Sequence, residues 1–335
     1  MIKRPTTAWR QRSATMTAID VVPAFPRPAR QLVVSIVILI IVLIALSVDA
    51  PRFFRYNNIL NVLLQAALLG LPAIGMTVVM IVGGIDLSLP ANVAMSAVAG
   101  ALYMKSGGNW PLGALIMAGT GVAIGIVNGI AVARLRMIPF VVTLATMTVV
   151  SGTSVWITNS LSISQLPSAF VETFDARPLF RIPVTVVMVA VLAWVVTVLM
   201  RSSIAGRWAY AVGINERAAR IARVPIARVI LASYVFSGLM AGLTAILLTA
   251  RLGSASANMG NDGVVLDIVS ACVVGGVSIY GGSGRIPGAL LGALLITVLS
   301  NAMNLIGVSF YLSLVVKGAV IIAFVAADRR KGSAQ

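Results

Sequence analysis

Long stretches without a charged residue constrain this chain more than any other feature of its sequence. Eight such stretches are at least 18 residues long, and the charged residues make up only 10% of the chain. Soluble domains carry about 25% charged residues, whereas a helix that crosses the roughly 30 Å bilayer core needs about 20 mostly apolar residues. The chain is therefore predicted to be a membrane protein built from spanning helices.

Adding the shorter uncharged runs 268-284 and 318-327 and trimming all of them at Gly, Pro and Asn turn signals predicts an all-α polytopic membrane protein with about ten transmembrane helices. They lie approximately at residues 31-48, 59-82, 90-104, 111-133, 139-159, 183-200, 229-249, 264-281, 286-305 and 309-327. The third and eighth helices adjoin the Gly-rich segments 83-90 and 275-288. Each segment could therefore belong to a re-entrant or broken helix instead of a continuous span.

The distribution of positive charge predicts the orientation. With ten spans, both termini lie on one side, which receives 18 of the 25 Lys and Arg residues, against six on the other. Cytoplasmic loops carry the excess of Lys and Arg, so both termini are expected in the cytoplasm. This gives a cytoplasmic basic arm (1-30), a transmembrane domain (31-328) and a cytoplasmic tail (329-335). This topology explains most of the net charge of +16, so no nucleic acid partner is expected.

Several chemistries are excluded by residues that the chain lacks. It has no His and a single Cys, Cys272, so no catalytic residue, cofactor or metal site is expected. The phosphate-binding pattern G-x-x-x-x-G-K-[ST] is also absent. If the chain is an active transporter, it must be driven by an ATPase in a separate chain, or be a secondary carrier coupled to an ion gradient. The few acidic residues near the spans, Asp86 and Asp267, weaken the carrier hypothesis without excluding it.

The largest polar insertion on the cytoplasmic side is the 201-228 loop. Asn215 is a candidate N-cap for a short helix from Glu216 to Arg223, with Glu216 and Arg220 spaced i,i+4, and Pro225 ends it. Such a helix could transmit motion from an ATPase. The pattern alone is equally typical of a solvated loop that only sets topology.

Motifs along most of the chain, from about Asn57 to Asp328, resemble those of one family. In order they are GMT at 75-77, GGIDLS at 83-88, NG at 128-129, PFVVTL at 139-144, GR at 206-207, GINERAAR at 213-220, LD at 266-267, GG at 275-276, GGSG at 281-284, Asn301 and KG at 317-318. The chain resembles the permease subunits of bacterial ABC importers for simple sugars, of the ribose, xylose and galactose type.

The resemblance implies a non-enzymatic subunit of a larger importer in the bacterial inner membrane. Its partners would be a cytoplasmic ATP-binding subunit, a periplasmic substrate-binding protein, a second permease subunit in a homodimer or heterodimer, and membrane lipid. It also makes coupling the favoured role of the 201-228 loop. The implied ATPase-coupling residues are Asn215, Glu216, Arg217, Ala218, Ala219, Arg220 and Arg223.

Polar residues within or beside the spans are candidates for the translocation path or gate, because a sugar presents many hydroxyl groups. They are Asp86, Asn128, Thr143, Asn301 and Asn304. Asn301 and Asn304 can share a helix face and are the preferred pore-lining pair, although interhelical hydrogen bonding is a slightly favoured alternative for them. Asp86 is either a gate or a static helix cap. Lys317, inside the last helix, should be paired, face a wet cavity or reach the interface.

Two series of glycines at i,i+4 spacing are predicted to let helices approach closely rather than to contact substrate. They are Gly121, Gly125 and Gly129 on one helix, and Gly284, Gly288 and Gly292 at the start of another. Beside the sugar permease, two alternatives remain open. One is the ion-coupled carrier, and the other is an ABC permease for a polyol, autoinducer-2 or a branched-chain amino acid.

Overall fold

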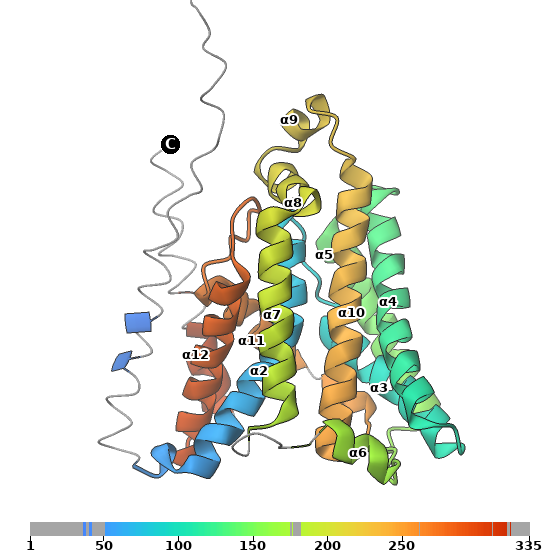
Figure 1. Ribbon diagram of the computed structural model, residues 1–335, viewed down its shortest axis with the longest axis vertical. Helices are drawn as coiled ribbons and strands as arrows, with labels where there is room; N and C mark the ends of the chain where they lie inside the picture. The colour runs from blue at the N-terminus through green and yellow to red at the C-terminus, as the bar shows by residue number, and fades with distance from the viewer. Residues whose placement is uncertain are drawn as a thin grey trace, which may run out of the picture.

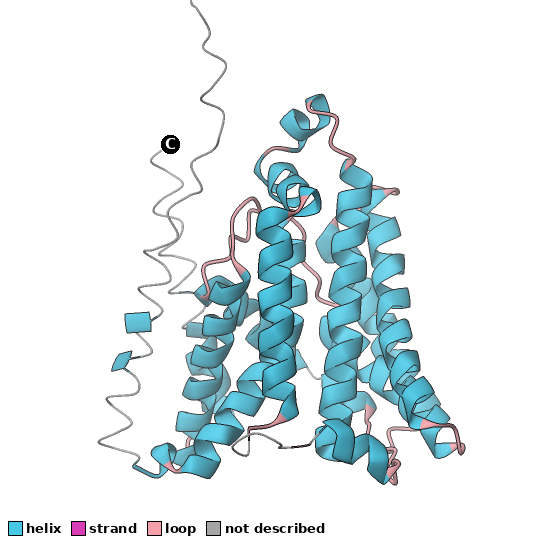
Figure 2. Cartoon of the chain, in the orientation of Figure 1, coloured by secondary structure: helices cyan, strands magenta, loops and turns pink. Residues whose placement is uncertain are grey.

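The computed structural model describes residues 36–37, 40–41, 51–174, 176, 182–260, 262–309, 311–319 and 322, and these are overwhelmingly helical (Figure 2). The elements are η1 (Pro51–Phe54), α2 (Tyr56–Ile81), α3 (Leu89–Lys105), α4 (Trp110–Ala133), α5 (Pro139–Thr158), α6 (Ser168–Phe174), α7 (Val184–Ser202), α8 (Ile204–Ile214), α9 (Glu216–Ile221), α10 (Ile226–Leu252), η2 (Ala257–Gly260), α11 (Asp262–Val274) and α12 (Ile286–Leu305). An isolated bridge joins Ile163 and Ala255.

Seven helical segments in this part of the chain are long and apolar enough to cross a membrane. They are Tyr56–Ile81, Trp110–Ala133, Pro139–Thr158, Val184–Ser202, Ile226–Leu252, Ala257–Val274 and Ile286–Leu305. The all-α polytopic prediction is confirmed. Seven predicted helices (59-82, 90-104, 111-133, 139-159, 183-200, 229-249 and 286-305) match observed helices within a few residues. The predicted helix 31-48 and most of 309-327 lie outside the described residues, although 311–319 is helical.

Three predictions about local structure were wrong or incomplete. The helix expected at 264-281 ends at Val274, because Gly276, Gly281 and Gly282 adopt positive φ angles of 81°, 88° and 70°, which favour glycine and end a helix. The 201-228 segment contains a helix, α8, that was not predicted. The short helix α6 was also missed.

The bundle is organised around α2, whose candidate span is the most buried of the seven. It packs against α7, α10, α11 and α12, while α10 packs on its other side against α4 (Figure 1). One end of the bundle carries α8 and α9, and the opposite end carries α6 (Figure 1). The two Gly-rich segments meet near the α8 end, where the Gly282 N–H donates to the Ile81 carbonyl at 2.9 Å.

Candidate functional site

The helix α9 projects from one end of the bundle and begins at the predicted cap. The Asn215 side chain accepts a hydrogen bond from the Ala218 N–H at 3.0 Å, and Arg220 pairs with Glu216 at 2.7 Å. The helix ends at Ile221, two residues earlier than predicted, because Arg223 has a left-handed φ of 58°. Both charged side chains of the pair are more than half exposed, so α9 presents a charged, preformed surface.

The unpredicted helix α8 fixes α9 to the transmembrane core. Ser203 caps α8 by accepting from the Gly206 N–H at 3.0 Å. Gly213 lies so close to Ile81 that a Cβ there would overlap the Ile81 carbonyl oxygen. The Tyr210 hydroxyl donates to the Gly284 carbonyl at 2.9 Å. The helix α8 therefore connects α9 to the end of α2 through direct contacts. The N-cap residue Ser203 was the sequence signal for α8.

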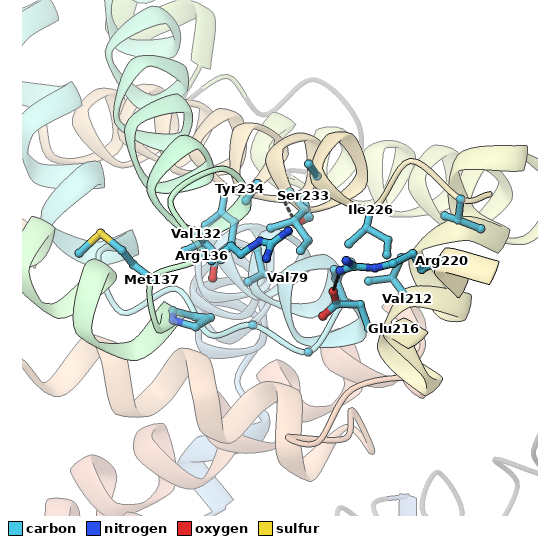
Figure 3. Close-up of a pocket in the computed structure, with 18 residues that line it drawn as sticks. Val79, Val132, Arg136, Met137, Val212, Glu216, Arg220, Ile226, Ser233 and Tyr234 are labelled. Carbon is cyan, nitrogen blue, oxygen red and sulfur yellow. Dashed lines mark hydrogen bonds and ion pairs between the residues drawn. The ribbon is translucent and has the colours of Figure 1, made fainter. Parts of the chain in front are cut away.

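A cleft of about 640 Å³ lies at the same end of the bundle (Figure 3). The ion pair between Glu216 and Arg220 lies at one end of it, and Arg136 and Met137 lie toward the other (Figure 3). Its remaining lining includes the glycines that follow α2 and the buried hydroxyl of Tyr234. Two of the candidate coupling residues, Glu216 and Arg220, thus line a cleft that extends to residues of the transmembrane helices α2, α4 and α10.

Asp86 is the centre of a buried hydrogen-bond network. It is 1% exposed, and its Oδ1 accepts from the Ser88 N–H at 3.1 Å and the Ser88 hydroxyl at 2.6 Å. Its Oδ2 accepts from the Ser237 hydroxyl on α10 at 2.8 Å. A buried carboxylate must be hydrogen-bonded to be tolerated, and Asp86 satisfies this with partners from two segments. Ser88 and Ser237 were missed in the sequence, although Asp-x-Ser is a typical turn pattern.

The same network includes two more of the predicted path residues. The Asn128 amide donates to the Ser88 hydroxyl at 2.8 Å and accepts from Thr146 at 2.7 Å. The Thr143 hydroxyl donates to the Pro139 carbonyl of its own helix at 2.9 Å and lies 3.3 Å from the Ile85 carbonyl, which can share the same proton. Asp86, Asn128 and Thr143 therefore come together from the α2–α3 turn, α4 and α5. In the described conformation they tie these elements to α10.

The two asparagines of α12 lie in different surroundings. Asn301 is 8% exposed and exchanges two hydrogen bonds with Asn58 of α2, at 3.0 and 3.1 Å. Asn304 is exposed. The surroundings of the two asparagines therefore differ, and Asn301 makes the interhelical hydrogen bonds that were the alternative to a pore-lining role.

A double-mutant cycle measures the contribution of the Asn58 and Asn301 pair. Polar pairs between membrane helices contribute about 0.6 kcal/mol on average, and at most about 1.7. Asn58→Leu and Asn301→Leu are each expected to destabilise the protein, with a coupling energy in that range, measured by unfolding in mixed detergent micelles. A coupling energy of zero would show that the two side chains do not interact.

The predicted glycine series lie at helix contacts, with one exception. Cβ atoms on Gly121 and Gly125 would overlap carbonyl oxygens of α10, and one on Gly129 would lie 2.7 Å from Leu231. Cβ atoms on Gly288 and Gly292 would overlap the carbonyl oxygens of Gly275 and Ala271. The exception is Gly284, which lies in the turn before α12 and has a φ of 155°.

Lys317 forms an ion pair with Asp267 of α11, with 2.9 Å between Nζ and Oδ2. The side chains are 12% and 23% exposed. Lys317 was predicted to be paired, to face a wet cavity or to reach the interface, and the structure shows it paired. An ion pair avoids the high energetic cost of an unpaired charge within a membrane.

Comparison with known proteins identifies the family. The model for "Branched-chain amino acid transport system / permease component" matches residues 58–325. The ribose import permease of Bacillus subtilis (strain 168) is 39% identical over 299 residues, which is 88% of this chain and 92% of that protein. The D-allose transport system permease of Escherichia coli (strain K12) is 35% identical, covering 88% and 90%.

A third relative, the galactose/methyl galactoside import permease of Haemophilus influenzae (strain Rd), is 31% identical over 90% of this chain and 95% of its own length. No solved structure matches the chain. The resemblance to sugar permeases of ABC importers that the motifs indicated is confirmed. This chain therefore belongs to the branched-chain amino acid transport system/permease component family, and it is an integral inner-membrane transport protein.

Proposed function

We propose that the chain is the membrane-spanning subunit of an ATP-driven, binding-protein-dependent importer that moves a monosaccharide across the inner membrane. The observation that carries this proposal is the similarity, at 31–39% identity over about nine tenths of the chain, to permeases named for ribose, allose and galactose. The relatives differ in their sugar, so the similarity supports the class of cargo rather than one member of it.

For the topology, we propose ten spans with both termini in the cytoplasm. The basic arm (1-30) and the tail (329-335) flank the transmembrane domain (31-328). The proposal is supported by the position of α8 and α9 at one end of the bundle (Figure 1), because the 201-228 segment that contains them is rich in arginine. By the positive-inside rule this end is cytoplasmic, and the end that carries α6 is periplasmic.

For the assembly, we propose a cytoplasmic ATP-binding subunit in a separate chain, a periplasmic substrate-binding protein, and a second permease subunit. The lack of a phosphate-binding loop in the sequence supports the separate ATPase. The chain itself then supplies the path and the coupling surface, and performs no chemical reaction.

For coupling, we propose that the segment from Asn215 to Arg223 receives the motion of the ATPase and that α8 passes it to α2. The exposed pair of Glu216 and Arg220 and the close packing of Gly213 on Ile81 support this route. The network around Asp86, Asn128 and Thr143 is the proposed gate, because it joins elements that must separate if access alternates. Asn301 and Asn304 remain proposed path residues toward the periplasm.

Copurification with the ATP-binding subunit tests the assembly and the coupling surface together. The double variant Glu216→Ala/Arg220→Ala is expected to weaken copurification at least about tenfold, because it removes the exposed charges that a partner would contact. The matched control is Arg52→Ala/Arg55→Ala, two exposed charges at the opposite end of the bundle, which should copurify as the wild type does. A wild-type protein that transports on an ion gradient without ATP would contradict the proposal.

A further inference from the structure

A second cavity lies in the half of the bundle away from α8 and α9. Its volume is about 370 Å³, and its lining comes from α2, α3, α10, η2, α11, α12 and the helical residue Lys317. Gln65 lies in the half of α2 opposite the Ile81 end that contacts α8, and Arg251 lies at the far end of α10. The cavity therefore occupies the half of the bundle that the proposed topology places toward the periplasm.

The ion pair of Asp267 and Lys317 lies in the wall of this cavity. Asp267 Oδ2 accepts from Lys317, whereas Oδ1 is buried and has no hydrogen-bond partner among the described residues. Buried polar atoms are almost always hydrogen-bonded, and an exception requires an explanation. Lys317 has three N–H donors, of which one goes to Asp267. The pair is neutral overall, and among the described residues only one hydrogen bond is seen for Lys317 Nζ and none for Asp267 Oδ1.

The other polar groups of the wall suit hydroxyl ligands. Thr244 and Ser300 donate their hydroxyl protons to backbone carbonyls of their own helices, at 2.7 and 2.8 Å. Their oxygens are thus left to accept hydrogen bonds. Gln65 adds an amide, which both donates and accepts. Arg251 is already hydrogen-bonded to Asn61 at 2.9 Å.

We infer that this cavity is a transient monosaccharide-binding site on the translocation path, in which Asp267 and Lys317 hydrogen-bond the sugar hydroxyl groups. The inference rests on the proposed function. A neutral polyhydroxy ligand fits a site whose buried charges neutralise each other and whose hydroxyl oxygens accept, and the volume lies at the small end of the about 300–1,000 Å³ typical of ligand sites. The described lining contains no aromatic side chain, which favours the weak binding that a passage requires.

The first test replaces the pair by apolar side chains, in Asp267→Leu/Lys317→Met. Replacing a buried ion pair by apolar residues of similar volume is often neutral or stabilising, so the variant should fold and copurify with the ATPase. If the pair binds sugar, ATP-driven uptake falls at least about tenfold. If the pair is only structural, uptake stays at the wild-type rate and the inference is wrong.

A matched pair of threonine variants on α10 provides a second test that does not touch a charge. Thr244→Val removes a hydroxyl in the cavity wall, and Thr249→Val removes a buried hydroxyl that does not line the cavity and has no partner among the described residues. We expect the first to raise the KM of uptake about threefold or more and the second to leave it unchanged. Equal KM values for both variants would overturn the inference.

Both tests use proteoliposomes that contain the complete importer with its ATP-binding subunit and binding protein. The probes are ribose, galactose, allose and leucine, each radiolabelled and assayed separately. Wild-type protein that takes up none of the three sugars with ATP, or takes up leucine instead, contradicts the proposed function. Wild-type uptake of a sugar that neither the double variant nor Thr244→Val alters contradicts only the cavity inference.

Discussion

Gly121→Leu is expected to abolish the folded protein. Gly121 lies on α4 directly against the backbone of α10, where a Cβ would overlap the Gly238 carbonyl oxygen and lie 2.8 Å from the Gly242 nitrogen. These are backbone atoms, which cannot rotate away as a side chain can. Overpacking a core typically costs about 1–3 kcal/mol, and separating two helix backbones should exceed that. The measurement is the yield of monodisperse protein after detergent extraction.

The same helix offers a control two residues away. Gly119 is exposed, and a Cβ there would meet nothing within 4 Å. Gly119→Leu adds the same side chain to α4 without disturbing the contact with α10, and it should be extracted in wild-type yield. If both variants gave the same yield, the close approach of α4 and α10 would not determine stability.

Asp86→Ala is expected to cause the second large loss of stability, because Asp86 accepts three hydrogen bonds in the core. Hydrogen bonds to charged groups contribute about 1.5–3 kcal/mol each, although removing the carboxylate also removes the cost of burying its charge. A net destabilisation of about 2–3 kcal/mol is expected, with Ser88 and Ser237 left without an acceptor. Unfolding in mixed detergent micelles measures it.

Asp86→Asn separates a static cap from a gate that depends on charge. The amide oxygen can still accept from Ser88, and a serine hydroxyl can accept from the amide nitrogen, so most of the stability should return. If Asp86 is only a cap, uptake returns with stability. If Asp86→Asn restores stability while uptake stays low, the negative charge itself takes part in the transport cycle.

The sequence by itself determined the helical class, the approximate spans and the family. These properties follow from local features: uncharged stretches long enough to cross a bilayer, and short motifs in a fixed order. The N-cap at Asn215 and the pair of Glu216 and Arg220 were also predictable, because both depend on spacing within one helical turn. The topology and coupling role stay predictions.

Only the tertiary structure decided which polar residues meet. Asp86 contacts Ser237, which is 151 positions away, and Asp267 contacts Lys317, which is 50 positions away. No local pattern encodes such partners, because they depend on how the helices pack and rotate against one another. For the same reason the structure separates Asn301 from Asn304, although the two are only three residues apart. Spacing places residues on a helix face, and packing decides whether that face meets another helix, a cavity or the surface.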